Sequence, residues 1–191
     1  MRSVGVLGGI FVGGSSSRMG RAKGLLPGPS GEALVVQLGA RLRAVGATPV
    51  LVGARPEYEA LGLPAITDAR YGAGPLGGLV ALLEAAGSRP AIAVACDMPW
   101  VDERLLARLA SAAPCAALAP RRADRWEPLC ARYDAALVLG AARARLDRGQ
   151  LALQGLLDEV GAIALWLDEH DLAKLDDWDT PESFAAATGR R

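Results

Sequence analysis

Residues 4–24 of the chain read VGVLGGIFVGGSSSRMGRAKG. The first part, residues 4–12, is continuously apolar apart from its glycines, which is typical of a strand buried on both faces of a sheet. The second part, Gly13 to Gly24, has the period of neither a helix nor a strand, and it contains Arg18 and Lys23. Glycines let backbone N–H groups converge on an anion, and the two cations add donors for phosphate oxygens. Because this loop follows the first strand directly, we predict that it binds phosphate; an ordinary surface linker is the alternative.

The rest of the chain alternates between strand and helix patterns, which predicts an α/β fold of three layers with a mostly parallel central sheet. In such sheets the ligand lies beyond the carboxyl ends of the strands, so the loops after Val12, Ile66, Ala95 and Tyr133 are the expected site. The predicted strands are residues 4–12, 49–52, 63–66, 91–95, 115–119, 127–133 and 163–167, and the predicted helices are residues 32–45, 56–61, 75–86, 102–110, 135–146, 151–160 and 180–187.

Composition narrows the class of protein. A chain of 191 residues with 51% apolar and 22% charged residues suits one packed globular domain. Lys+Arg and Asp+Glu both number 21, so there is no broad attraction for nucleic acid or for an anionic membrane. No segment has the length of a membrane span. The three cysteines contain no C-x-x-C pair and are typical of reduced thiols, so we expect a cytoplasmic protein.

Two carboxylates follow predicted strands at the edge where the ligand is expected. Asp97 comes directly after residues 91–95 and suits a hard cation such as Mg²⁺, although a turn cap before Pro99 is the alternative. Asp68 follows residues 63–66 in the same way and is a weaker candidate.

A competing motif lies further along the chain. Residues 72–77, GAGPLG, match the G-x-G-x-x-G pattern of dinucleotide-binding proteins, and Asp97 follows at about the spacing of a ribose-binding acid, about 20 residues. However, residues 67–71 separate the first glycine from the preceding strand. This interpretation would also leave Arg18 and Lys23 without a role.

Other polar and aromatic residues carry weaker signals. Glu127 is a candidate contact for a second substrate, and Asp177 and Asp179 are candidates for metal binding or for capping the last helix. His170 is expected in a solvated loop, and we assign it no role. The four tryptophans, Trp100, Trp126, Trp166 and Trp178, are expected to pack in the core.

Several motifs together resemble those of one family. Residues 11–20, FVGGSSSRMG, followed by KGLL at 23–26, resemble the L-A-G-G-x-S-x-R-M-G…K-x-L-L signature of molybdenum cofactor guanylyltransferases, the MobA-type enzymes. Four more segments match in order: Asp68 with GPLGG at 74–78, CDMP at 96–99, EPL at 127–129, and DTPE at 179–182. The resemblance therefore spans nearly the whole chain.

The resemblance implies a Rossmann-like nucleotidyltransferase that joins GMP from GTP to the phosphate of molybdopterin and releases pyrophosphate. It also implies a nucleotide-binding half over residues 1–100 and an acceptor-binding half over residues 101–191, with proteins that handle molybdopterin as further partners. Backbone at Phe11, Val12, Gly13, Gly14 and Ser15 would hold the nucleotide, with contacts from Lys23 and Asp68. Asp97 would bind Mg²⁺, Arg18 would stabilise the leaving pyrophosphate, and Glu127, Asp177 and Asp179 would face the acceptor.

The chain also departs from the family pattern. Val12 and Gly53 stand where the family has alanine and often asparagine, and Asp177 and Asp179 each replace an asparagine. A molybdopterin cytidylyltransferase or a sugar-phosphate nucleotidyltransferase remains the nearest alternative. An NAD-binding oxidoreductase that uses residues 72–77, or a non-catalytic carrier, is the alternative from another class.

Overall fold

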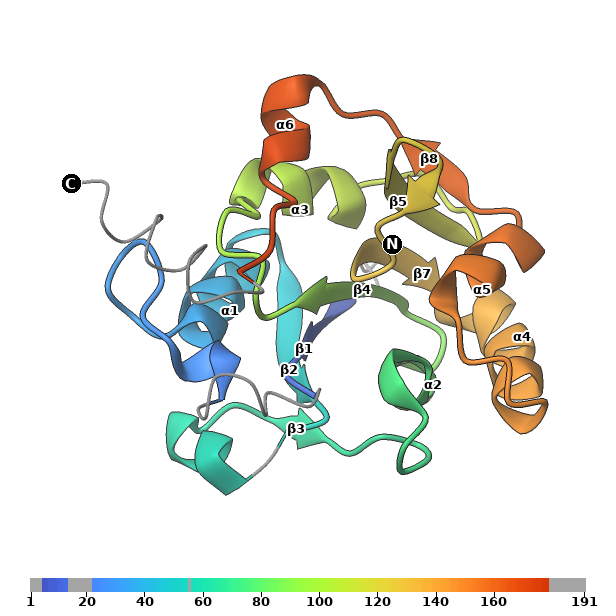
Figure 1. The fold of residues 1–191 in the computed structure, drawn as a ribbon, viewed down its shortest axis with the longest axis horizontal. Helices are drawn as coiled ribbons and strands as arrows, with labels where there is room; N and C mark the ends of the chain where they lie inside the picture. Colours follow the sequence, from blue (N-terminus) through green and yellow to red (C-terminus); the bar gives the residue numbers. More distant parts are fainter. Residues whose placement is uncertain (1–4, 14–21, 55, 179–191) are drawn as a thin grey trace.

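One sheet of eight strands crosses the part of the molecule that the computed structural model describes, residues 5–13, 22–54 and 56–178 (Figure 1). The strand order is β3-β2-β1-β4-β7-β5-β6, and β8 pairs with β5. The strands are β1 (Val6–Phe11), β2 (Ala47–Val52), β3 (Ala65–Ile66), β4 (Pro90–Ala95), β5 (Ala117–Arg122), β6 (Arg125–Trp126), β7 (Cys130–Asp134) and β8 (Ile163–Leu165).

Strand direction differs between the two sides of the sheet. Strands β1 to β4 are parallel to one another, and β8 is parallel to β5. Strand β7 is antiparallel to both β4 and β5, and the short β6 is antiparallel to β5. The sheet is therefore mostly parallel, as predicted, with β7 as a reversed strand in its interior.

Helices cover both faces of the sheet and complete three layers (Figure 1). On one face, α1 (Leu34–Ala44), α3 (Glu103–Ala110) and α6 (Glu169–Ala173) pack over one apolar cluster. On the other face, α2 (Gly74–Ala86), α4 (Ala135–Asp147) and α5 (Leu153–Glu159) pack over a second. Two short 3₁₀ segments lie at Lys23–Leu25 and Pro56–Leu61. No helix of the described residues has the length and apolar character that a membrane crossing needs.

Two glycines let helices approach β1 closely from both sides. A Cβ at Gly8 would lie 2.9 Å from the Leu42 side chain of α1, and a Cβ at Gly9 would lie 2.6 Å from the Leu82 side chain of α2. Successive residues of a strand face opposite sides of the sheet, so these glycines serve opposite helices. Strand β1 therefore lies deep in the molecule, and its carboxyl end lies between those of β2 and β4.

The second half of the chain differs from the predicted elements. The strand predicted at 127–133 begins only at Cys130, and Pro128 lies in the preceding loop, where its carbonyl accepts a hydrogen bond from Tyr133 Oη at 2.8 Å. Proline has no N–H to donate to a strand partner, which explains the later start. Strand β6 and helix α6 were not predicted, and His170 lies exposed within α6 rather than in a loop. The helix predicted at 180–187 lies outside the described residues.

The four tryptophans, all expected in the core, differ in how far they are buried. Trp126 and Trp178 are buried, as expected. Trp100 is 39% exposed and Trp166 is 76% exposed, so the prediction of core packing is wrong for both. Trp166 follows β8, which pairs with β5 beside the main strand path, and there the next residue along, Leu167, is the one that is buried.

Candidate functional site

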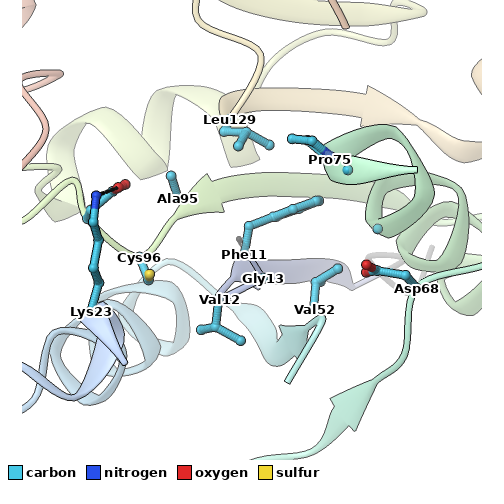
Figure 2. Close-up of a pocket in the computed structure, with 13 residues that line it drawn as sticks. Phe11, Val12, Gly13, Lys23, Val52, Asp68, Pro75, Ala95, Cys96 and Leu129 are labelled. Atoms are coloured by element: carbon cyan, nitrogen blue, oxygen red, sulfur yellow. Dashed lines mark hydrogen bonds and ion pairs between the residues drawn. The ribbon is translucent and has the colours of Figure 1, made fainter. Parts of the chain in front are cut away.

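A cavity of about 320 Å³ opens where β1, β2 and β4 end (Figure 2). The backbone holds these strand ends together beyond the strands themselves. Val12 N–H donates to the Val52 carbonyl at 3.0 Å, and Cys96 N–H donates to the Phe11 carbonyl at 3.1 Å. The lining residues are Phe11, Val12, Gly13, Lys23, Val52, Asp68, Gly74, Pro75, Gly78, Ala95, Cys96, Asp97 and Leu129.

Six of the residues predicted from sequence meet in this cavity: Phe11, Val12, Gly13, Lys23, Asp68 and Asp97. Four others, Gly14, Ser15, Arg18 and Asp179, lie outside the described residues. Figure 2 shows Lys23 at one end of the cavity and Asp68 at the other, with Phe11 between them. The cavity therefore has a lysine at one end and the Asp68 carboxylate at the other.

At the first end, Lys23 and Asp97 form an ion pair across 74 residues of sequence, with 3.2 Å between Nζ and Oδ2. The Lys23 and Asp97 side chains keep 19% and 22% of their surface exposed, so incoming polar groups can reach both. Lys23 begins a 3₁₀ turn whose Gly24 packs against α1, since a Cβ there would lie 2.6 Å from Val35 Cγ1. This close packing fixes the backbone from which Lys23 extends.

At the other end, Asp68 lies between two glycines. A Cβ on Gly53 would lie 3.1 Å from Asp68 Oδ1, and a Cβ on Gly78 would lie 3.2 Å from the same oxygen. Gly53 also has a φ of +71°, a conformation that favours glycine. Burial raises the pKa of the Asp68 carboxyl, because the charged form loses hydration there. The absence of a side chain at position 53 thus leaves room for the Asp68 carboxylate.

The donor set fits a magnesium ion that binds together with a nucleotide. No group of three or more His, Cys, Asp or Glu side chains suited to a metal occurs within the described residues. Mg²⁺ is commonly held by one or two carboxylates, with substrate phosphates and water completing its six ligands. Asp97 offers one such carboxylate at the edge of the cavity, and Lys23 beside it suits phosphate oxygens.

Cys96 lines the cavity beside Asp97 and was not predicted as a site residue. Burial raises the pKa of its thiol to about 12, and the Asp97 carboxylate acts in the same direction. The thiol is therefore protonated at neutral pH and acts as a small apolar wall. The only feature of the sequence that points to Cys96 as a site residue is its position in the CDMP segment.

A second group of residues lies beside the cavity around Glu127. Leu129 lines the cavity, and its carbonyl accepts a hydrogen bond from Ala95 N–H at 2.8 Å. Burial and the nearby Asp177 carboxylate raise the pKa of Glu127, against the effect of the Arg122 guanidinium, which lies 3.7 Å away. Glu127 and Asp177, 50 residues apart in sequence, are thus close enough for their charges to interact, and their contact with an acceptor stays a prediction.

The prediction that four loops border the ligand site is wrong for one of them. Because β7 is antiparallel to β4, the loop after Tyr133 lies at the opposite edge of the sheet from the cavity. The loop before β7, which carries Glu127 and Leu129, takes its place. The reversed strand could not be inferred from an alternating pattern of strands and helices.

The strand order also argues against the dinucleotide interpretation of residues 72–77. That fingerprint joins a glycine loop to an acidic residue on the adjacent strand. Here the glycine loop follows β3 and Asp97 follows β4, and β2 and β1 lie between these two strands. Gly74 and Gly78 instead bring the first turn of α2 against the cavity.

The comparisons with known proteins agree with this geometry. A family model described as the MobA-like NTP transferase domain matches residues 8–161. The molybdenum cofactor guanylyltransferase of Xanthomonas euvesicatoria pv. vesicatoria is 34% identical over 187 residues, which cover 93% of this chain and 92% of that protein. The molybdenum cofactor guanylyltransferase of Rhodobacter capsulatus is 33% identical over 197 aligned residues, which cover 100% and 97% of the two chains.

Solved structures extend the comparison to the fold. Molybdopterin-guanine dinucleotide biosynthesis protein A from Archaeoglobus fulgidus has a TM-score of 0.77 at 23% identity, covering 94% of this chain and 95% of its own. The 2-C-methyl-D-erythritol 4-phosphate cytidylyltransferase from Thermus thermophilus has a TM-score of 0.68 at 18% identity, covering 95% and 96%. With the family model over residues 8–161 and relatives at 33–34% identity over nearly the full length, the chain belongs to the MobA-like NTP transferase family, a family of nucleotidyltransferases.

Proposed function

We propose that this protein transfers GMP from GTP to molybdopterin and releases pyrophosphate. The observation that carries the proposal is the Lys23–Asp97 pair, which faces Asp68 across a cavity at the carboxyl ends of β1, β2 and β4. This arrangement offers a cation for phosphates at one end and a carboxylate for N–H donors at the other. The names of the relatives from Xanthomonas and Rhodobacter support guanine as the base and the molybdenum cofactor as the acceptor.

In this proposal the nucleotide lies along the cavity. Backbone groups at Phe11, Val12 and Gly13, together with Gly14 and Ser15, hold the base and sugar. The Asp68 carboxylate accepts hydrogen bonds from the N–H groups of guanine. The triphosphate extends toward Lys23 and Asp97, and Arg18 binds the leaving pyrophosphate.

The proposed chemistry needs positioning and charge more than proton transfer. A phosphate oxygen of molybdopterin forms a new bond to the α-phosphorus of GTP, and the bond between that phosphorus and the oxygen bridging to the β-phosphate breaks. The attacking phosphate is already anionic near neutral pH, so no general base is required. Asp97 would hold Mg²⁺, which when bound supplies positive charge at the α-phosphate. Lys23 and Arg18 offset the charge that develops on pyrophosphate.

The acceptor is proposed to approach from the second half of the chain. Glu127 precedes Leu129, which lines the cavity, and Asp177 precedes Trp178, whose N–H bonds the Asp97 carbonyl; Asp179 follows two residues after Asp177. We therefore assign residues 1–100 to the nucleotide and residues 101–191 to molybdopterin. A cytoplasmic location is part of the proposal and is supported by the three cysteines, all of which are free thiols.

The test is pyrophosphate release by the purified protein with molybdopterin and GTP, CTP or ATP, each with Mg²⁺ and with a chelator. We expect release with GTP and Mg²⁺, and Asp97→Asn should lower the rate by about 100- to 1,000-fold, the usual cost of one fixed electrostatic group. Asp147→Asn is the matched control, because that side chain is 71% exposed and pairs only with the Arg70 guanidinium among the ion pairs described.

Three results would contradict parts of the proposal. Release with CTP in place of GTP would indicate a cytidylyltransferase. Full turnover by Asp97→Asn would remove the role assigned to that carboxylate. NAD binding without Mg²⁺ would favour the dinucleotide interpretation of residues 72–77.

A further inference from the structure

The loop that carries Asp97 is held in place mainly by contacts from other segments of the chain. Within the loop, Met98 N–H donates to the Ala95 carbonyl and Val101 N–H donates to the Met98 carbonyl, and both distances are 3.4 Å. These are long for N–H···O bonds, which are usually about 2.9–3.0 Å. The loop's own turns therefore restrain Asp97 only weakly.

Shorter bonds reach the loop from two other segments. Arg41 of α1 donates from Nη1 to the Pro99 and Val101 carbonyls, at 2.8 Å each. Trp178, near the end of the described chain, donates its backbone N–H to the carbonyl of Asp97 itself at 2.9 Å. The backbone at Asp97 is thus fixed by a residue 81 positions away in sequence.

Trp178 contacts the same loop a second time through its side chain. Its indole is 3% exposed and meets the Trp100 ring edge to face, with the centroids 6.0 Å apart and the planes at 81°. This is a favoured arrangement for aromatic pairs. One residue therefore holds the loop at Asp97 by its backbone and at Trp100 by its ring.

The segment that delivers Trp178 is anchored to the far end of the loop. Asp102, the N-cap of α3, accepts a hydrogen bond from Leu105 N–H at 2.9 Å and pairs with Lys174 Nζ at 2.7 Å. Lys174 Nζ also pairs with Asp171 at 2.8 Å, and Asp171 is only 2% exposed. Because Lys174 and Trp178 attach at opposite ends of residues 97–102, the C-terminal segment forms a brace across the loop.

We propose that Trp178, paired with Trp100, is a positioning residue that holds the Asp97 carboxylate where it binds the metal of the nucleotide complex. The inference rests on the proposed function, since it assumes that Asp97 is a metal ligand. A brace of this kind acts on Asp97 through the backbone, as outer partners of metal ligands commonly do. Loss of such partners typically lowers metal affinity or activity by about 10- to 100-fold.

The experiment measures metal binding without turnover. Mn²⁺ is titrated into the full-length protein in the presence of GTP and no molybdopterin, free Mn²⁺ is followed by its electron paramagnetic resonance signal, and the binding measured with GTP alone is subtracted. We expect Trp178→Leu to raise the Mn²⁺ dissociation constant by about 10- to 100-fold. Trp178→Phe, which keeps an aromatic ring, should retain most of the affinity. Trp166→Leu is the matched control, because that tryptophan is 76% exposed and comes after β8, which ends at the same edge of the sheet as β4.

A spectroscopic readout separates positioning from a loss of folding. Two indole rings at this distance give a coupled band in the far-ultraviolet circular dichroism spectrum, which Trp178→Leu and Trp100→Leu should both remove and Trp166→Leu should keep. If Trp178→Leu does not fold, Trp100→Leu takes its place in the titration with the same expected loss.

Two outcomes would overturn the inference. Equal Mn²⁺ affinities for Trp178→Leu, or for Trp100→Leu in its place, and for Trp166→Leu, in a protein that still transfers GMP, would overturn the brace alone. A wild-type protein that binds no Mn²⁺ with GTP and releases no pyrophosphate would overturn both the brace and the proposed function.

Discussion

Partial burial disfavours the charged form of Asp68 at one end of the cavity. Burial raises the pKa of its carboxyl, so the ionised form lowers the free energy of unfolding at neutral pH relative to a neutral side chain. We therefore expect Asp68→Asn to raise the thermal midpoint at pH 7. The same change should weaken GTP binding by about 10- to 100-fold, because an acceptor for the N–H groups of guanine is lost.

The sign of the pH dependence follows from the raised pKa. As the pH falls through the raised value of the folded protein, Asp68 takes up a proton before the unfolded chain does, and the stability gap between wild type and Asp68→Asn closes. GTP affinity of the wild type should fall over the same range, which lies above the ordinary carboxyl value of about 3.9. Thermal unfolding with and without GTP at a series of pH values measures both effects. Asp124→Asn, at an exposed position, should change neither.

Six of the thirteen residues that line the cavity could be predicted, because parallel strands end at one edge of the sheet. Lys23 and Asp97 are 74 residues apart, and their 3.2 Å pairing follows from β1 and β4 being neighbours. The hydrogen bond from Trp178 N–H to the Asp97 carbonyl could not be predicted, because a backbone bond leaves no trace in residue type. Arg41 was missed for a related reason, since an arginine on an amphipathic helix usually faces solvent.

At the scale of elements, helix α2 is placed by a glycine that forms part of the cavity wall. A Cβ at Gly78 would lie 2.8 Å from Val52 Cγ1 and 2.9 Å from Phe11 Cε1, and both of these residues line the cavity. We expect Gly78→Ala to cost about 1–3 kcal/mol in unfolding free energy through overpacking. It should also weaken GTP binding, because the displaced side chains move into the cavity.

Gly140→Ala provides the comparison for that prediction. Gly140 lies exposed in α4, and an added Cβ there would meet nothing within 4 Å. Alanine should stabilise this helix by about 0.5–1 kcal/mol relative to glycine. Denaturant unfolding of both variants measures the difference. Equal effects of the two substitutions would show that the contacts at Gly78 do not set the position of α2.

The strands and helices of the first half could be predicted closely, while the order and direction of the later strands could not. The apolar runs that became β1, β2 and β4 are long and continuous, and the helices between them have a clear period. Strand β7 looks the same in sequence whether it runs parallel or antiparallel to β4. Its reversal is decided by which residues it meets across the sheet, which is information that one segment does not contain.

On the scale of the whole molecule, the predicted nucleotide and acceptor halves share one sheet and one core. Strand β4 of the first half pairs with β7 of the second, from Pro90 opposite Asp134 to Val94 opposite Cys130. Helix α2 of the first half and helices α4 and α5 of the second pack in the same apolar cluster. On the surface, Arg143 of α4 pairs with Glu84 of α2 at 2.9 Å. Neither half can therefore lose its structure without exposing the other.

We accordingly predict that the protein unfolds as one cooperative unit, although chains longer than about 150 residues often populate intermediates. The two probes weight the halves differently, because three of the four tryptophans lie within residues 101–191, whereas α1 and α2 contribute helical signal from the first half. Tryptophan fluorescence and far-ultraviolet circular dichroism should give the same denaturant midpoint. Two separate midpoints would instead show that residues 1–100 and 101–191 unfold independently, and the predicted halves would then be domains. Trp166→Phe, which removes only the most exposed indole, should leave the coincidence unchanged.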